Sequence, residues 1–588
     1  MMQYEPQPWE LEDLLPRPGT AEMEANIEEL KERLERFEQR RTDLVSEIAV
    51  ATFQGILGAY EQLYADATTL TAYSYLWFSE DTANQQARAF RARVNQLAAD
   101  IENRTLFFTL WWRELADEPA ARLLEAAGDT RYYLESLRRF KPYTLSEPEE
   151  RLINVKDVNG IQSVLTIYDM ITNGFEFRFV VDGEEQILTR GELMSYASDP
   201  SPDLRTAAYQ ELFRVYRGET DVLSEIYAAR VRDWTEEQVK IRGFESPISV
   251  RNLSNDVPDE VVETLLEVIR HNTPLFQRFF HLKARALGLD RLRRYDLYAP
   301  LSEAERRYEF GEAIQLVDEA YRAFSPPLAD MAMRVLAENH LDAEIRPRKM
   351  GGAYCYGVLP DLTPWVLTNY AGKVRDVSTL AHELGHAIHA MAAADHSVLT
   401  FHSTLPMAET ASVFGEMLLT DKLLAEEVDP AVRRSLLATV LDDAYATIVR
   451  QGYFVLFEKT AHRLILGNAT PDQLKGAYLD NLREQFGDAI DLSEDFDIEW
   501  TAIPHIYQTP FYCYAYAFGN LLVLALYRKY KEIGKAFEPD YRRILSYGGS
   551  RSPEHIVSEA GFDMASPDFW QSGFDLLAEM LAELEKLV

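Results

Sequence analysis

Cysteine is scarce in this chain, and its scarcity excludes any fold that is held together by disulfides. Only Cys355 and Cys513 occur among 588 residues. They lie far apart and do not have the spacing of a zinc-binding thiol pair. The pattern is typical of a protein in the reducing cytosol, and we therefore expect a cytoplasmic location.

Positive charge is also in short supply. The chain has 60 Lys and Arg against 95 Asp and Glu, which gives a formal net charge of −35. Binding a nucleic-acid backbone requires clustered Lys and Arg, so we expect no nucleic-acid partner. A solvated acidic surface is the simplest interpretation of this charge, although the same surface also attracts basic peptides over a distance.

Long hydrophobic runs and targeting signals are missing as well. The most apolar late segment, residues 521–527, is too short to span a bilayer. Residues 1–6 lack the basic and apolar regions of a signal peptide. We therefore expect no membrane partner. The sequence leaves the oligomeric state open, and a monomer is compatible with it.

The dominant pattern that is present is helical. Ile27, Leu30, Leu34 and Phe37 recur every three to four residues among charged residues, and similar patterns continue from residue 20 to about residue 141. The apolar and aromatic run over residues 105–112 predicts a buried helix. Helical patterns resume over residues 204–339, so the sequence predicts a mainly α-helical fold.

Two short stretches of strand interrupt the helices. Residues 175–189 alternate Phe with charged residues and contain Asp182-Gly183, which predicts a β-hairpin. The Ser-, Pro- and Asp-rich residues 195–203 then suggest a boundary. We predict an N-terminal helical region over residues 1–198 and a second domain over residues 199–588, packed together as one bilobed unit.

A second pair of strands is predicted just before the chain's main motif. Residues 353–356 and 365–368 are strand-like and are separated by a loop with two prolines. A small sheet in this place suits an enzyme that holds an extended peptide by adding it to a sheet edge.

The most informative motif is His382-Glu383-Leu384-Gly385-His386. On a helix, the four-residue spacing places His382 and His386 on one face, where two imidazoles can hold one zinc ion. Glu383 then projects toward the place of an attacking water. Chance predicts roughly 0.03 occurrences of such a pattern in a chain of this composition. The motif therefore predicts a zinc site, but it supplies only two ligands.

The third ligand is predicted from spacing. The three-histidine version of the motif needs Gly at position 389 and His at position 392, but the chain has His389 and Ala392 there. A glutamate on a second helix is the other common solution, and Glu409 fits it, although a carboxylate that interacts with a helix dipole is the simpler alternative. Glu416 follows two turns later as a hydrogen-bond acceptor for a ligand histidine.

Three segments resemble the oligoendopeptidase F family of zinc endopeptidases. They are residues 375–389 (RDVSTLAHELGHAIH), residues 9–16 (WELEDLLP) and residues 407–412 (MAETAS). Together they extend the resemblance over essentially the whole chain. The resemblance implies a mainly helical, bilobed protein with a deep substrate channel and one zinc ion per chain. It also implies that the substrates are short peptides and that folded proteins are excluded.

The resemblance also bears on the aromatic residues 504–516. An aromatic cluster of this kind is usually core packing. The family has an analogous His and Tyr segment, which implies that His505, Tyr507 and Tyr514 donate hydrogen bonds to the oxyanion. The register is set by the spacing of the two tyrosines, and Tyr512 and Tyr516 remain alternatives.

These inferences predict a zinc-dependent endopeptidase of short oligopeptides. His382, His386 and Glu409 would hold the zinc ion, and Glu383 would act as general base and then as general acid. Two alternatives stay open. One is a carboxydipeptidase on the same scaffold, which needs a group for the substrate's free carboxylate. The other is a non-catalytic peptide-binding protein that contains zinc, although a structural zinc site usually has four protein ligands.

Overall fold

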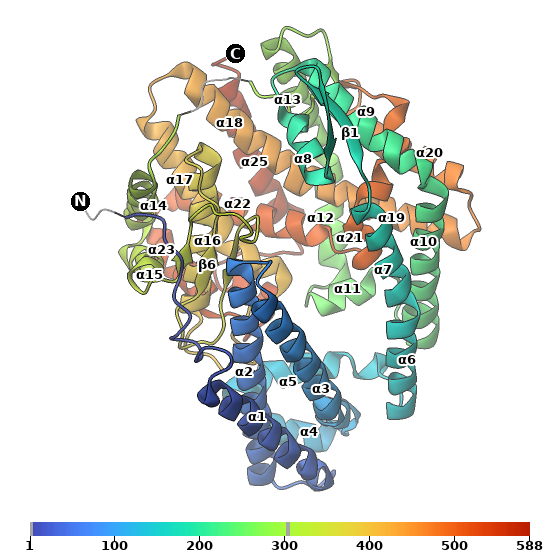
Figure 1. The fold of residues 1–588 in the computed structure, drawn as a ribbon, viewed down its shortest axis with the longest axis vertical. Coiled ribbons are helices and arrows are strands. Elements are labelled where there is room, and N and C mark those ends of the chain that lie inside the picture. Colours follow the sequence, from blue (N-terminus) through green and yellow to red (C-terminus); the bar gives the residue numbers. More distant parts are fainter. Residues whose placement is uncertain (1–3, 302–305) are drawn as a thin grey trace. The chain divides into compact units, whose positions relative to one another are not determined.

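Helices make up most of the chain (Figure 1). The computed structural model describes residues 4–301 and 306–588. Three small sheets accompany the helices: a hairpin, a parallel pair and a three-stranded sheet. The predicted mainly α-helical class is confirmed.

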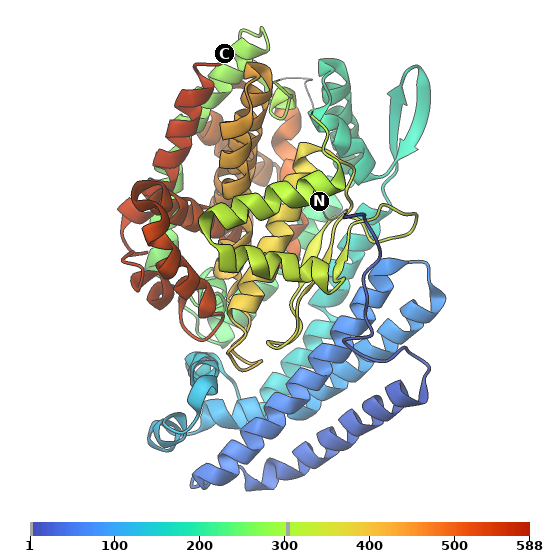
Figure 2. The same ribbon diagram turned by 90° about the vertical axis from the view of Figure 1, so that its left-hand side faces the viewer.

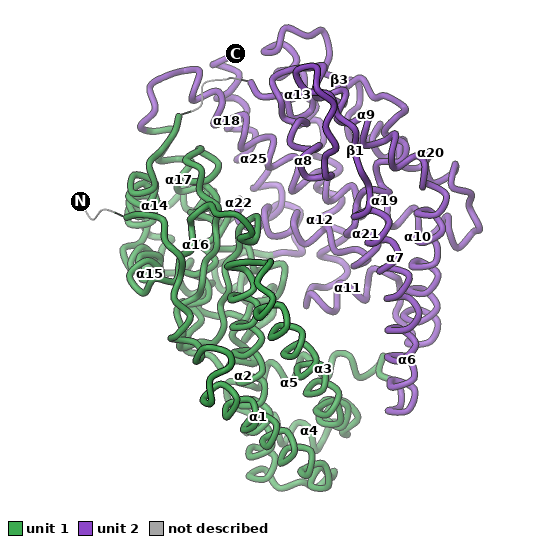
Figure 3. Tube along the Cα trace, viewed as in Figure 1, with its two compact units in different colours: residues 1–144, 306–425, 526–563 green, residues 145–305, 426–525, 564–588 purple. Residues whose placement is uncertain are grey.

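The described chain divides into two compact units, each built from three separate segments (Figure 3). Unit 1 comprises residues 1–144, 306–425 and 526–563, and unit 2 comprises residues 145–305, 426–525 and 564–588. The predicted boundary between residues 198 and 199 lies inside unit 2. As a division of the sequence it stays a prediction, and so does the bilobed shape with a deep channel.

Unit 1 contains the long N-terminal helices and the motif helix. Its elements are α1 (Ala21–Gln39), α2 (Val50–Glu80), α3 (Gln85–Glu114), α4 (Asp117–Leu124), α5 (Arg131–Arg139), α14 (Phe310–Phe324), α15 (Pro326–Ala337), β4 (Leu341–Asp342), β5 (Tyr354–Tyr356), β6 (Trp365–Leu367), α16 (Val374–Ala392), α17 (Ser412–Glu426), α23 (Glu538–Ser546) and α24 (Pro553–Ser558). The end of α22 (Tyr514–Ile533) also belongs to it.

Unit 2 is a second helical body with a hairpin. Its elements are α6 (Glu147–Asn159), α7 (Ile161–Asn173), β1 (Phe177–Val181), β2 (Glu184–Leu188), α8 (Arg190–Ser195), α9 (Pro202–Gly218), α10 (Thr220–Trp234), α11 (Ser249–Ser254), α12 (Asp259–His271), α13 (Thr273–Ala286), β3 (Leu292–Arg293), α18 (Pro430–Ala444), α19 (Arg450–Leu466), α20 (Pro471–Phe486), β7 (Ile490–Asp491), α21 (Pro504–Gln508), the first part of α22, and α25 (Pro567–Leu584).

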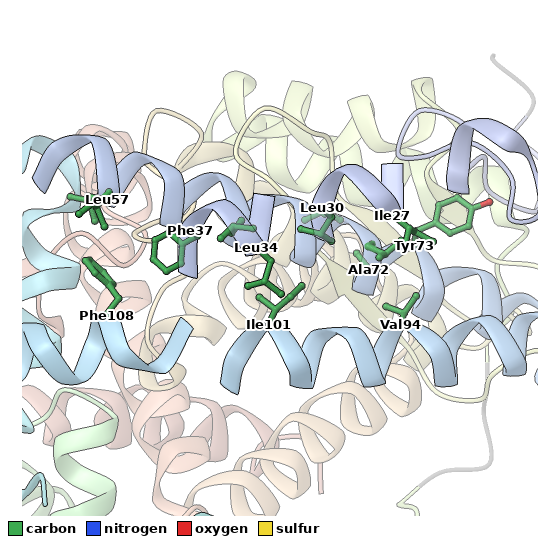
Figure 4. Packing of buried hydrophobic residues seen from close by; sticks show 14 of the residues in the cluster. Ile27, Leu30, Leu34, Phe37, Leu57, Ala72, Tyr73, Val94, Ile101 and Phe108 are labelled. Carbon is green, nitrogen blue, oxygen red and sulfur yellow. The ribbon is translucent and has the colours of Figure 1, made fainter. Parts of the chain in front are cut away.

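The core of unit 1 begins with α1, α2 and α3, which run side by side (Figures 2 and 4). The Thr20 side chain caps α1 by accepting a hydrogen bond from the backbone N–H of Met23. The four apolar residues that predict α1 are all buried: Ile27, Leu30, Leu34 and Phe37. The predicted buried helix over residues 105–112 is confirmed as the last turns of α3, where Phe107, Phe108 and Trp112 are buried.

The same core includes residues much later in the chain. Val358, Trp365 and Leu367 are fully buried in the cluster formed by α1, α2 and α3. The Trp365 indole N–H also donates to the carbonyl of Glu10, at 2.7 Å. These contacts join the N-terminal helices to the sheet that precedes the motif helix.

Both predicted strand pairs are confirmed. Strands β1 and β2 form an antiparallel hairpin, and Asp182 and Gly183 at its turn have φ angles of 53° and 84°, as a tight turn between twisted strands requires. Strands β5 and β6 are also antiparallel. The two-residue strand β4, which the sequence pattern did not predict, pairs with β6, so the sheet order is β4-β6-β5.

A bilayer-spanning helix requires a long, apolar stretch with few charges. Among the residues that the structure describes, no helix combines that length with that apolarity.

Candidate metal centre

Helix α16 carries the motif and is fixed at its start by a side-chain cap. The Asp376 carboxylate accepts hydrogen bonds from the backbone N–H groups of Ala371 and Lys373, at 2.9 and 3.0 Å. Asp376 therefore caps the start of α16. About two turns after its start the helix presents His382 and His386 on one face, and their Nε2 atoms are 3.1 Å apart.

Glu409 reaches the two histidines from another segment of unit 1. The single helix predicted around it is in fact two: a 3₁₀ helix over Leu405–Thr410 and then α17. The two meet at Ala411, whose backbone lies against Gly385. A Cβ atom added to Gly385 would lie 2.5 Å from the Ala411 carbonyl oxygen. The absent side chain is what allows this approach.

The three ligand candidates have the spacing of a tetrahedral zinc site. The carboxylate Oε2 of Glu409 lies 3.3 Å from the Nε2 atom of His382 and 3.5 Å from that of His386. One atom from each of the three residues lies within 4.8 Å of the others. Zinc–ligand bonds of about 2.0–2.1 Å at tetrahedral angles place ligand atoms roughly 3.3 Å apart. The donor set and its spacing therefore fit a zinc ion.

Glu416 orients His382. The Nδ1–H group of His382 donates to the Glu416 carboxylate at 2.6 Å, and this bond turns the Nε2 atom toward the cluster. The predicted role of Glu416 as an acceptor for a ligand histidine is confirmed. On the other side of the cluster, the Ser412 hydroxyl donates to Oε2 of Glu409 at 2.6 Å.

Burial and neighbouring charges set the ionisation of the cluster. Burial lowers the pKa of His386 to about 4, which keeps its imidazole neutral. Burial also acts to lower the pKa of His382, but the hydrogen bond and charge of Glu416 outweigh it and raise that pKa to about 9. Burial acts to raise the pKa of Glu409, yet the two histidines hold it below its usual value. Glu409 is therefore ionised beside a neutral imidazole.

Glu383 is poised next to the cluster without joining it. Its side chain is buried, and its Oε2 atom has no hydrogen-bond partner among the described residues. Burial raises its pKa to about 7, with the charge of His382 opposing that shift. A carboxyl group whose pKa is near neutrality is suited to taking up and releasing a proton.

The other histidines of this region do not join the cluster. His389 lies one turn beyond His386, is buried, and has a pKa lowered to about 4 by burial. His396 instead contacts Asp129 and the carbonyl of Ser546. His402 lines the cavity described next.

A cavity of about 940 Å³ opens on the cluster within unit 1. One wall consists of β5 and α16, including His382, Glu383 and His386. Residues from α2 and α3 also line the cavity. Strand β5 is the edge of its sheet, and its second edge pairs with no other strand in the described part of the chain.

The predicted oxyanion donors belong to unit 2. Tyr507 and Tyr514 are fully buried. The Tyr507 hydroxyl donates to the carbonyl of Leu223 at 3.4 Å, and the Tyr514 hydroxyl accepts from the amide of Asn255 at 2.8 Å. His505 is only partly buried.

The alternative tyrosines are more accessible. Tyr512 and Tyr516 are partly buried, and their rings pack against the ring of His505. Whether any residue of this segment contacts the oxyanion stays a prediction.

Sequence reasoning missed two features of the site. It did not predict the cavity wall from α2 and α3, because the residues concerned are far from the motif in sequence. It also missed the approach of the Ala411 backbone to Gly385, although a glycine between the two histidines was a usable signal for close packing.

Comparisons with known proteins give a consistent result. The model of peptidase family M3 matches residues 195–576, and a model described as oligopeptidase F matches residues 112–177. Group B oligopeptidase PepB of Streptococcus agalactiae is 28% identical over 536 residues, which are 88% of this chain and 87% of that protein. Oligopeptidase PepF of Bacillus subtilis is 24% identical over 593 residues, which are 99% of this chain and 87% of that protein.

Solved structures share the fold. Oligoendopeptidase-F from Enterococcus faecium superposes with a TM-score of 0.73 at 22% identity, covering 96% of this chain and 98% of that one. PZ peptidase A with an inhibitor superposes with a TM-score of 0.76 at 18% identity, covering 96% of this chain and 98% of that one. At these identities the likeness is evidence for the fold alone.

Proposed function

The chain belongs to peptidase family M3 and is a metallopeptidase that hydrolyses oligopeptides, and from this premise we propose that it cleaves internal bonds of short peptides with one zinc ion. His382, His386 and Glu409 would hold that ion, and Glu383 would move the proton. Short peptides are the proposed partners, and the proposed location is the cytoplasm.

One observation carries the proposal. The three ligand atoms form a triangle with edges of 3.1, 3.3 and 3.5 Å, which is the spacing that a tetrahedral zinc ion requires. A catalytic zinc site has three protein ligands and one open position, whereas a structural site is usually closed by four. The described cluster has three members.

The chemistry assigned to Glu383 follows from its position. When bound, zinc supplies the Lewis acidity that activates a water and polarises the scissile carbonyl. Glu383 accepts the proton of the attacking water and then delivers it to the leaving amine. Its unpartnered Oε2 atom and its pKa of about 7 support this exchange.

The cavity supports an extended peptide as substrate. Strand β5 lines the cavity together with the zinc ligands, and one of its edges is unpaired in the described chain. A peptide added to that edge would pair with the outward-facing backbone groups of β5, and its own backbone would then run past the metal cluster. Recognition through the backbone suits an enzyme that accepts many sequences.

The composition of the cavity favours internal cleavage over removal of C-terminal dipeptides. A carboxydipeptidase has to bind the free carboxylate of its substrate, normally with Lys or Arg. No Lys or Arg occurs among the residues that line this cavity. The carboxydipeptidase is therefore the second candidate, and a non-catalytic zinc protein leaves the proton-transfer position of Glu383 unexplained.

Digestion of a mixed peptide pool tests the proposal. We expect the zinc-loaded chain to cut internal bonds of short peptides, a chelator to abolish the cuts, and added zinc to restore them. Glu383→Gln should retain one zinc ion per chain, because it does not touch the ligands, and should lose at least about 1,000-fold in kcat. Mass spectrometry of the products and zinc analysis measure both results.

An exposed carboxylate in the same unit provides the control. Glu125→Gln should retain full activity. Peptide cleavage by zinc-loaded Glu383→Gln at the wild-type rate would refute the general-base assignment. Trimming of two residues from carboxyl ends would favour the carboxydipeptidase, and no chelator-sensitive cleavage at all would favour the non-catalytic alternative.

A further inference from the structure

Part of the lining of the cavity consists of one face of each of two packed helices. Helix α2 contributes residues at helical spacing: Tyr60, Leu63, Tyr64, Ala67, Thr68 and Thr71. Helix α3 contributes Ala98, Ile101, Glu102 and Thr105, again at intervals of three or four. The two helices pack along their length within unit 1. These two helix faces therefore form one part of the lining of the cavity that also contains the metal cluster.

Charge on the cavity lining has one sign apart from the histidines. The lining includes two carboxylates, Glu102 and Glu383, and no Lys or Arg. Glu383 has its own role beside the metal cluster. Glu102 is therefore the one carboxylate of the lining that the proposed reaction does not use.

Glu102 differs from its neighbour Asp100 in having no partner. Arg104 donates to the carboxylate of Asp100 at 3.3 Å and to that of Glu38 at 2.7 Å. The carboxylate of Glu102 makes no hydrogen bond or ion pair with any residue that the structure describes, and the side chain is exposed to the cavity. Its charge is thus available to a ligand.

The surroundings of Glu102 suit the side chain of Lys or Arg. Such side chains have an apolar stem and a charged end. Ala98 and Ile101, on the same face of α3, offer apolar surface to the stem. The ring of Tyr64, which is 41% exposed, offers a π face to a cation, and Glu102 offers the opposite charge.

We propose that Glu102 is a specificity-determining residue that selects peptides with a Lys or Arg side chain at one position near the cleaved bond. The inference deepens the proposed function and rests on it only in taking the cavity as the peptide-binding site. The cavity then discriminates by charge through Glu102, while β5 binds the peptide backbone without regard to sequence.

A binding experiment tests Glu102 without requiring turnover. The full chain carrying Glu383→Gln is loaded with zinc and titrated calorimetrically with eight-residue peptides that are identical except for one position, which is Lys, Gln or Glu. Scanning that position along the peptide should reveal a place where the Lys peptide binds about five-fold more tightly than the Gln peptide, as expected for one partly solvated ion pair. The preference should shrink as salt is added.

Two further substitutions assign the preference to one carboxylate. Adding Glu102→Gln should bring the Lys-to-Gln ratio of affinities to about one, and adding Glu102→Lys should make the Glu peptide the tightest binder. Asp100→Asn is the matched control, because Asp100 lies on the same helix, does not line the cavity and is paired with Arg104. It should leave the ratio unchanged.

Several results would overturn the proposal. They are a Lys-to-Gln ratio near one at every position, including the absence of binding, a ratio that survives Glu102→Gln, and an equal loss in Asp100→Asn. Failure of the proposed function has a separate signature, namely that the wild-type chain shows no chelator-sensitive cleavage of the peptide pool. The binding comparison uses an inactive variant and is decided independently of that result.

Discussion

Gly385 lies between the two histidines of the motif, at the point where α16 touches the backbone of Ala411 and Ser412. A second glycine acts in the same way on α17. A Cβ atom at Gly415 would overlap the hydroxyl of Tyr321, which donates to the carbonyl of Ala381 at 2.8 Å. These two close approaches bring the segment bearing Glu409 and Glu416 against the motif helix. The ligand geometry therefore depends on residues that touch no ligand.

Substituting Gly385 tests this dependence. Gly385→Ala forces the Ala411 backbone to move, so we expect a loss of about 1–3 kcal/mol in stability and a fall of at least 10-fold in zinc affinity. Urea unfolding and competition with a chelator measure the two quantities. Gly58→Ala on α2, where a Cβ atom meets nothing within 4 Å, should be neutral or slightly stabilising. Unchanged zinc affinity in Gly385→Ala would contradict the argument.

Side chains from other helices of unit 2 bind the backbone of residues 504–514, the segment from α21 to the start of α22. Arg230 donates to the carbonyl of Tyr507 at 3.1 Å, and Glu458 accepts from the N–H of Phe511 at 2.8 Å. Phe511 has a φ of 59°, an uncommon backbone conformation for a bulky residue. These buried contacts specify one conformation for the segment on which the predicted oxyanion donors lie.

Two tyrosine substitutions distinguish a structural role from a catalytic role for the tyrosines of this segment. Tyr514→Phe leaves the buried amide of Asn255 without its acceptor, so we expect a loss of about 1–2 kcal/mol in stability. Tyr516→Phe, at a partly exposed site, should cost much less. An oxyanion donor loses about 100-fold in kcat when its hydroxyl is removed. A fall of this size in the kcat of Tyr514→Phe would support Tyr514 as the oxyanion donor. If only Tyr516→Phe shows it, Tyr516 is the donor instead.

Glu458, which binds this segment, makes the stability of the folded chain depend on pH. Burial raises the pKa of this fully buried carboxyl to about 8, against the opposing effect of the Phe511 N–H. An unfolded glutamate titrates near 4.3, so between about pH 5 and 8 the folded chain keeps a proton that the unfolded chain releases. Stability therefore falls as the pH rises through this range, by up to about 1.4 kcal/mol per pH unit.

Comparing the wild-type chain with Glu458→Gln isolates this contribution. The variant cannot ionise at this position, so its urea-unfolding free energy should fall less steeply from pH 5 to 8. Glu125→Gln, at an exposed site, should keep the wild-type slope. Identical slopes for the wild type and Glu458→Gln would show that the carboxyl is not protonated in the folded chain.

Across the whole molecule, features set by local sequence patterns could be predicted, whereas features set by long-range contacts could not. The stripe of Ile27, Leu30, Leu34 and Phe37 and the hairpin turn at Asp182 both follow from helical or strand spacing within short stretches. Strand β4 has only two residues and is defined by its partner β6, so no local pattern marks it.

The cavity wall at Glu102 and the left-handed Phe511 were also beyond local patterns. Their partners are distant in sequence: Glu102 shares its cavity with the motif helix, and Glu458, which binds the Phe511 N–H, lies 53 positions earlier. Periodicity carries no information about which distant helices meet.

Unit 1 cannot be separated by a single cut in the sequence. A fragment of residues 199–588 lacks α1, α2 and α3, which bury Val358, Trp365 and Leu367. We expect this fragment to aggregate or to remain largely unfolded, and to bind no stoichiometric zinc, because a core of this size stabilises by several kcal/mol. Circular dichroism and zinc analysis of the expressed fragment check this expectation. A folded fragment that binds one zinc ion would refute it.

The alternation of the two units along the chain also has a consequence for biosynthesis. Residues 1–144 leave the ribosome first, but the residues that complete their core lie within residues 306–425, and the last segment of unit 1 ends at residue 563. At a synthesis rate of about 5–20 residues per second, the apolar faces of α1, α2 and α3 remain without those partners for roughly 10–60 s. Throughout that interval the nascent chain exposes the surface that chaperones bind. Its production in cells is therefore expected to depend on chaperone supply more than that of a chain whose units are contiguous.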